Sequence, residues 1–215
     1  MQVKITERDL LLIVDVQNDF CSSGALAVPH GDEVVSAINR LSRLFQHVVL
    51  TQDWHPRGHL SFASSHPGAE AFQVVDVAYG RQTLWPDHCV QQSYGAEFHP
   101  ALETAKAELI LRKGFRMEID SYSAFRENDG AARTGFAGYL REREIERVFL
   151  AGLAYDYCVR FSAVDARSEG FSAVVIEDAC RGIGLEGPAE NGSMEETRRE
   201  FAERGVSHIQ AEWIG

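Results

Sequence analysis

The chain has 215 residues, of which 45% are hydrophobic, and this is enough apolar material for one well-buried domain. Acidic residues outnumber basic residues by 32 to 21, which gives a net charge of −11 at pH 7. This excess of negative charge argues against nucleic acid and anionic membrane surfaces as partners. It favours a protein that acts on a small molecule.

The first residues, MQVKITERDL, carry charges where a signal peptide has an apolar stretch, and no apolar run is long enough to span a membrane. The four cysteines are far apart and form no CxxC pair, so we expect free thiols. They are Cys21, Cys89, Cys158 and Cys180. These features predict a cytoplasmic protein.

Short runs rich in Val, Ile and Leu alternate with segments of helical spacing. Continuous apolar character is typical of strands that are buried on both faces of a parallel sheet. In chain order we expect a strand at 11–16, a helix at 33–46, strands at 47–52 and 108–113, a helix at 131–144, a strand at 147–153, a helix at 156–170, a strand at 171–178, a helix at 189–205 and a last strand at 206–213. This order predicts a three-layer α/β/α fold with a mostly parallel six-stranded sheet.

Residues 54–107 form a connection that is much longer than a crossover helix requires. The segment contains Pro56, Pro67, Pro86 and Pro100, and its many aromatic residues argue against disorder. We expect an ordered, lid-like insertion after the second strand, within a single domain that comprises residues 1–215.

Reactive side chains follow the predicted strands at the points where these strands end. The first strand leads to Asp15, the second to Asp53 and His55, and the third to Lys113. Cys158 follows the fourth strand, where a helix is expected to begin. Because ligands bind beyond the carboxyl ends of parallel strands, we expect these side chains to share one site.

Cys158 is a candidate nucleophile. A helix N-terminus stabilises a thiolate. Lys113 and Asp15 follow other strands at the same edge of the sheet, which we call the rim, and offer a cation and a proton acceptor. The alternative is a buried structural cysteine, the commonest state of a free thiol. We expect that state for the other three cysteines.

A second constellation has the composition of a metal site. Asp53 and His55 are two residues apart, so on an extended chain they project to the same side. His88 is a candidate third ligand, and His59 is a further candidate. Three such ligands with open positions describe a catalytic divalent-metal site, and the alternative is a solvated turn.

Five sequence blocks occur in a characteristic order: DVQNDF, TQDWHPRGHLSF, LWPDHCV, RKG followed by DSYSAF, and AGLAYDYCV. In this order they resemble the nicotinamidase branch of the isochorismatase-like cysteine hydrolases. The resemblance extends from residue 11 to about residue 180.

The resemblance implies a metal-dependent amidase of NAD salvage that converts nicotinamide to nicotinate and ammonia through a thioester. Pyrazinamide is expected as a further substrate of the same pocket. The resemblance implies a catalytic triad, which consists of Asp15, Lys113 and Cys158. It implies one divalent metal ion, Zn²⁺ with Fe²⁺ or Mn²⁺ as alternatives, bound by Asp53, His55 and His88. Some members use a further histidine as a ligand, which His59 matches.

The resemblance also implies a pocket for the pyridine ring and an oxyanion hole. The residues that match the pocket walls are Phe20, Trp85, Tyr122 and Tyr157. A cis peptide bond is expected between Leu153 and Ala154, and the oxyanion hole would consist of the backbone N–H groups of Ala154 and Cys158.

Other functions remain open at this stage. A related amidase for carbamoyl or ureido substrates would share the acid, lysine and cysteine, but such relatives generally lack the metal residues. A vinyl-ether hydrolase of the same fold would need no thiol at Cys158. A protein that binds nicotinamide without catalysis would not need all three residues of the triad. A homo-oligomer is an open alternative to a monomer.

Overall fold

The computed structural model describes residues 2–186 and 192–215. Within these ranges six strands form the main sheet, and each neighbouring pair is parallel. The strand order is β5-β2-β1-β6-β7-β8. The strands are β1 (Asp9–Val14), β2 (His47–Asp53), β5 (Leu109–Lys113), β6 (Arg147–Leu153), β7 (Ser172–Arg181) and β8 (Ser207–Ile209).

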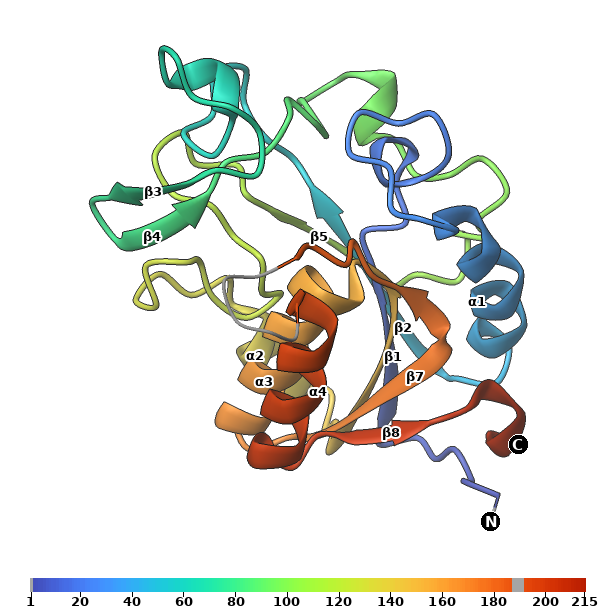
Figure 1. The fold of residues 1–215 in the computed structure, drawn as a ribbon. Coiled ribbons are helices and arrows are strands. Elements are labelled where there is room, and N and C mark those ends of the chain that lie inside the picture. Colours follow the sequence, from blue (N-terminus) through green and yellow to red (C-terminus); the bar gives the residue numbers. More distant parts are fainter. Residues whose placement is uncertain (1, 187–191) are drawn as a thin grey trace.

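Helices cover both faces of this sheet. Figure 1 shows α1 on one face and α2, α3 and α4 on the other. Their bounds are Val34–Ser42, Phe136–Glu142, Arg160–Ser168 and Gly192–Arg204. The predicted three-layer α/β/α fold with a parallel sheet is therefore confirmed.

A hydrophobic core lies on each face of the sheet. Strand β1 contributes to both cores because its side chains alternate between the two faces. Leu11 and Ile13 belong to the core under α1, whereas Leu10 and Leu12 belong to the core under α2, α3 and α4. Every residue of β1 is buried. This explains why the central strand is continuously apolar.

Some predicted boundaries were wrong. Helix α2 begins at Phe136 rather than at residue 131, because Gly135 has a left-handed φ of 91°. The last strand ends at Ile209, and a 3₁₀ turn, Ala211–Trp213, follows. Residues 189–191 of the predicted helix 189–205 lie outside the described residues.

The connection from β2 to β5 lies beyond the carboxyl ends of the central strands (Figure 1). It contains a two-stranded hairpin of β3 (Val74–Val77) and β4 (Gly80–Thr83). Isolated β-bridges form within this connection, and another one pairs its Phe98 with Gln17, which follows β1. Across the described parts of the chain, no helix combines the length and the apolar character that a membrane span requires.

Candidate active site

Four side chains meet where the neighbouring strands β5, β2, β1 and β6 end. Asp15 follows β1, and its φ of 45° turns the chain out of the sheet. Asp53 and Lys113 are the last residues of β2 and β5 and are neighbours in the sheet register. Cys158 lies in the turn that follows β6. The parallel sheet is therefore what brings these residues to one rim.

Lys113 is at the centre of this group. Its Nζ lies 2.8 Å from Asp15 Oδ2 and 2.5 Å from Asp53 Oδ1. It also donates hydrogen bonds to the Ser121 carbonyl at 3.1 Å and to Cys158 Sγ at 3.3 Å. Carboxylate oxygens of Asp15 and Asp53 lie within 4.8 Å of the sulfur and of each other. The thiol and the two carboxylates therefore form one buried cluster around Lys113.

The two carboxylates differ in proton affinity. Burial raises the pKa of Asp15, and the opposing effect of Lys113 does not cancel this. Burial would also raise the pKa of Asp53, but Lys113 and His55 outweigh it and hold that pKa well below the usual value. Burial would lower the pKa of Lys113, but the two acids raise it well above its usual value. Asp15 is thus suited to exchange a proton, and Asp53 is suited to remain a ligand or a counter-ion.

Cys158 lies in a π-helical turn, Tyr155–Val159, that continues directly into α3. Burial raises the pKa of this thiol well above its usual value, although Lys113 lowers it in part. The sequence suggested that the helix N-terminus stabilises a thiolate, whereas burial favours the protonated thiol. The peptide bond between Leu153 and Ala154 is cis, at the position that the resemblance implied.

Asp53, His55 and His88 form a buried group with the donors of a divalent-metal site. The Asp53 Oδ2 atom lies 3.4 Å from His55 Nε2 and 3.7 Å from His88 Nε2. The Nδ1 atoms of both rings lie 2.8 Å from backbone carbonyls, those of Gly114 and Pro86. These carbonyls can accept Nδ1–H bonds, and this leaves Nε2 of both rings available as a metal donor beside Asp53 Oδ2.

The structure places His59 apart from that group. Its ring packs 4.3 Å from the His55 ring, centroid to centroid, and its Nδ1 lies 2.8 Å from Ser61 Oγ. It groups instead with His55 and Asp120. Burial and the neighbouring His55 lower the pKa of His59 to about 4.

A small pocket opens on the rim beside these groups. It is lined by the residues expected there, Phe20, Asp53, Trp85, His88, Tyr122, Ala154, Tyr157 and Cys158. The rings of Trp85 and Tyr157 are 4.8 Å apart and nearly perpendicular, and Tyr122 lies 5.5 Å from Tyr157. The Tyr122 hydroxyl accepts hydrogen bonds from Trp85 Nε1 and Gln82 Nε2, which fix its position. The arrangement offers an aromatic slot next to a thiol.

Sequence reasoning missed three lining residues, Leu26, Asp120 and Ile183. Ile183 follows the carboxyl end of β7. The expectation that ligands bind beyond the carboxyl ends of parallel strands, which singled out Asp15 and Lys113, could therefore have found Ile183 too. Asp120 begins the block DSYSAF, two residues before Tyr122. Leu26 carries no local signal beyond its apolar character.

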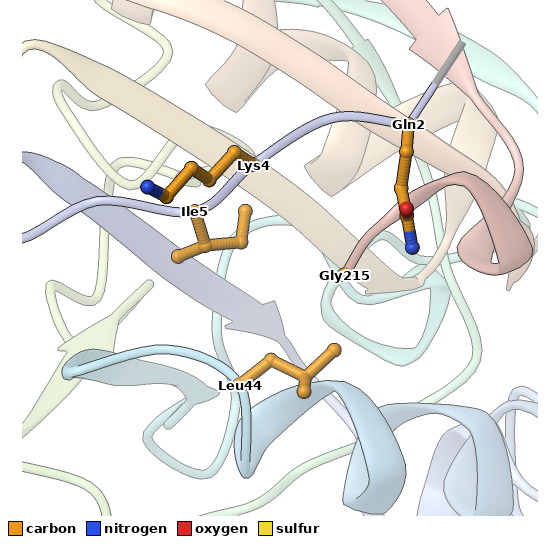
Figure 2. Close-up of a pocket in the computed structure, with 5 residues that line it drawn as sticks. All are labelled: Gln2, Lys4, Ile5, Leu44 and Gly215. Atoms are coloured by element: carbon orange, nitrogen blue, oxygen red, sulfur yellow. The ribbon is translucent and has the colours of Figure 1, made fainter.

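A larger hollow of about 470 Å³ lies elsewhere and has different chemistry (Figure 2). Ile5 precedes β1 and Leu44 precedes β2, so this hollow is at the amino ends of the strands. Among its described lining residues, Gln2, Lys4, Ile5, Leu44 and Gly215, there is no cysteine, histidine or acidic side chain. The rim pocket, although smaller, is therefore the candidate active site.

Comparison with known proteins agrees with this geometry. A family model described as the isochorismatase domain matches residues 9–204. The chain belongs to the isochorismatase family. This confirms the family to which the five sequence blocks pointed.

Curated relatives cover most of the chain. It is similar to a nicotinamidase of Acinetobacter baylyi, at 46% identity over 211 residues, which are 98% of this chain and 96% of the relative. It is also similar to a nicotinamidase of Escherichia coli, at 46% identity over 180 residues, with 82% and 84% of the two chains covered.

Three solved structures with the same fold are similar to this chain over most of its length. A nicotinamidase and pyrazinamidase from Acinetobacter baumanii has a TM-score of 0.93 and 48% identity, and 96% and 98% of the two chains are covered. PnC1 from L. infantum, in complex with nicotinate, has a TM-score of 0.85 and 36% identity, with 100% and 99% covered. A pyrazinamidase from Pyrococcus horikoshii, in complex with zinc, has a TM-score of 0.74 and 33% identity, with 94% and 99% covered.

Proposed function

We propose that this protein is a nicotinamidase of NAD salvage, which hydrolyses nicotinamide to nicotinate and ammonia. The observation that carries the proposal is the contact of Lys113 with both Asp15 and Cys158, beside a group of three metal-type donors. Nicotinamidases of 46% identity over most of the chain support the same substrate.

Asp15 and Cys158 carry the proposed covalent step. The thiol proton passes to the Asp15 carboxylate as the sulfur attacks the amide carbon, and the raised pKa of Asp15 suits this role. Asp15 then gives the proton to the amide nitrogen, the C–N bond breaks, and ammonia leaves a thioester on Cys158. Water deprotonated by Asp15 attacks the thioester carbon, the C–S bond breaks, and the sulfur recovers a proton.

Lys113 and two backbone groups stabilise the charges that develop. The ammonium of Lys113 lies between the acid and the thiol, so it can balance whichever of the two is negative. The N–H groups of Ala154 and Cys158 are proposed to receive the oxyanion, because both residues line the pocket.

The donor set Asp53, His55 and His88 fits a divalent ion, because the Nδ1 atoms of both histidines lie within hydrogen-bonding reach of backbone carbonyls, which leaves Nε2 free to bind. When bound, such an ion supplies a Lewis acid that can hold a pyridine nitrogen and withdraw electron density from the ring. We propose Zn²⁺, since a related pyrazinamidase was solved with zinc, and Fe²⁺ and Mn²⁺ are the alternatives. His59 is left out of this set.

The walls of the pocket determine the orientation of the substrate. Phe20, Trp85, Tyr122 and Tyr157 present the aromatic faces and edges between which a pyridine ring would lie. A pyrazine ring has the same size and shape, so we propose pyrazinamide as a second substrate.

Ammonia release tests this proposal. We expect the purified, metal-loaded protein to release ammonia from nicotinamide with a kcat/KM at least about 100-fold higher than from simple carbamoyl and ureido compounds. The reverse preference would instead support the related amidase, and binding of nicotinamide without ammonia release would indicate a protein that does not catalyse.

A further inference from the structure

The segment that follows β7 closes one side of the rim pocket. Ile183 lines this pocket and packs against the core cluster that contains Phe20 and Leu26. The cavity that remains is about 20 Å³, close to the space that one water molecule needs. A planar ring must therefore press against the apolar walls, and each wall residue limits what the ring can carry.

A buried carboxylate holds this segment in place. Asp156 is 1% exposed and lies two residues before Cys158 in the same π-helical turn. Its Oδ1 accepts a hydrogen bond from Ile183 N at 2.9 Å. Its Oδ2 accepts hydrogen bonds from Gly184 N at 2.8 Å and from Ser193 Oγ at 2.6 Å. The position of Ile183 is thus fixed relative to the nucleophile.

The segment is also held from its other side. A Cβ atom added to Gly182 would lie 2.2 Å from Met194 Sδ and 3.1 Å from Asp156 Oδ1. Ser193 N donates a hydrogen bond to the Leu185 carbonyl at 2.9 Å. The backbone of the segment is therefore enclosed between the turn and α4, and this holds Ile183 in the pocket wall.

We infer that Ile183 is a specificity-determining residue, which excludes pyridine amides that carry a substituent on the ring edge facing it. The inference rests on the proposed function and deepens it. Asp156 is the positioning residue that acts through Ile183, by hydrogen bonds to the backbone of the segment.

The test compares nicotinamide with its four ring-methylated forms, which carry the methyl group at carbon 2, 4, 5 or 6. For each variant the measured quantity is kcat/KM for a methylated amide divided by kcat/KM for nicotinamide. We expect Ile183→Ala to raise this ratio at least about tenfold for one or two methyl positions, because one methylene in an apolar pocket is worth about 10–200-fold. Leu185→Ala is the matched control, since Leu185 lies in the same segment but does not line the pocket, and its ratios should equal those of the wild type.

Asp156→Asn provides a second, independent arm. It keeps the size of the side chain and weakens the bonds that hold Ile183, so the ratio should rise at the same methyl positions and KM should change more than kcat. Ratios that stay within twofold of the wild type in both variants would overturn the role of Ile183 and leave the nicotinamidase proposal standing. A wild-type protein that releases no ammonia from nicotinamide would overturn both.

Discussion

Lys113 shows how strongly the chemistry of one residue depends on its neighbours. It is 1% exposed, and an ammonium in such a place is unstable unless anions pair with it. Asp15 and Asp53 supply two, so the site holds one cation and two acids before any metal or substrate arrives. The pKa of the Cys158 thiol is raised chiefly by burial, and the two acids add to this while Lys113 opposes it.

Replacement of the proposed nucleophile should separate chemistry from folding. We expect Cys158→Ala to lower kcat by about 10⁴-fold or more, because a nucleophile and its base act as a unit. The variant should fold and retain its metal, as determined by circular dichroism and by metal analysis. Cys180→Ala removes another buried cysteine, on β7, and should keep its activity. Wild-type activity in Cys158→Ala would remove the nucleophile from the mechanism.

Gly114 is required by the packing of His55. Its φ of 64° is left-handed, and an added Cβ would lie 2.4 Å from His55 Cε1. We expect Gly114→Ala to displace the His55 ring and to lower both zinc content and ammonia release. Gly130→Ala is the control, since its φ of 70° brings the same backbone penalty of about 1–2 kcal/mol but no clash. Equal zinc content in the two variants would contradict this explanation.

At the scale of elements, β1 and β6 are joined by a partly buried ion pair at their amino ends. Arg147 Nε and Nη2 donate to Asp9 Oδ1 and Oδ2 at 2.7 and 2.8 Å, and Thr6 N donates to Oδ2 at 2.7 Å. Burial would raise the pKa of Asp9, but these hydrogen bonds outweigh it and lower the pKa below its usual value of 3.8. The pair fixes the register from which both strands run to the active site.

The lowered pKa gives the stability contribution of Asp9 a defined pH dependence. A group whose pKa is depressed on folding stabilises the protein above its unfolded pKa, and this contribution is lost as the pH falls through the folded pKa. We expect Asp9→Asn to lower the free energy of unfolding by about 1.5–3 kcal/mol at pH 7, and the difference should shrink as the pH falls below 3.8. Urea unfolding from pH 7 to pH 3 measures this. Asp76→Asn, on the exposed side of β3, should change stability little at any pH.

At the scale of the whole molecule, the three-layer fold and the site at the carboxyl ends of the strands could be predicted from the sequence. Both follow from the continuously apolar strands of a parallel sheet. Asp15, Asp53 and Lys113 could be placed together because parallel strands end at one edge of the sheet. The pocket walls Phe20, Trp85, Tyr122 and Tyr157 came from the resemblance, because no periodicity links residues of four separate loops and turns.

Other features could not be predicted, because they depend on contacts between distant segments. The two strands of the hairpin β3–β4 have four residues each and are mostly exposed, so they are shorter than the apolar runs that revealed the other strands. The role of Asp156 depends on the approach of residues 183–193, which nothing near residue 156 indicates. The raised pKa of the Cys158 thiol depends on burial, which is set by the packing of distant segments around it.

Metal removal should destabilise the whole fold, since Asp53 ends β2 while His88 comes from the long connection. A ligand that binds only the native state adds RT ln(1 + [L]/Kd), about 2.7 kcal/mol at a concentration of 100 Kd. We expect chelation to lower the melting temperature and Zn²⁺ to restore it. His88→Ala should abolish that response, and His66→Ala should keep it, because His66 lies outside the donor group. An unchanged melting temperature after complete chelation would contradict a stabilising ion at this place.

One carboxylate gives this architecture an evolutionary constraint. The two oxygens of Asp53 serve different neighbours, one the lysine and the other the imidazole pair. A lineage that gave up its metal could discard both imidazoles, yet it would still need an acid at this position to keep Lys113 charged. Loss of metal dependence in such a lineage should therefore begin at the histidines and spare the aspartate.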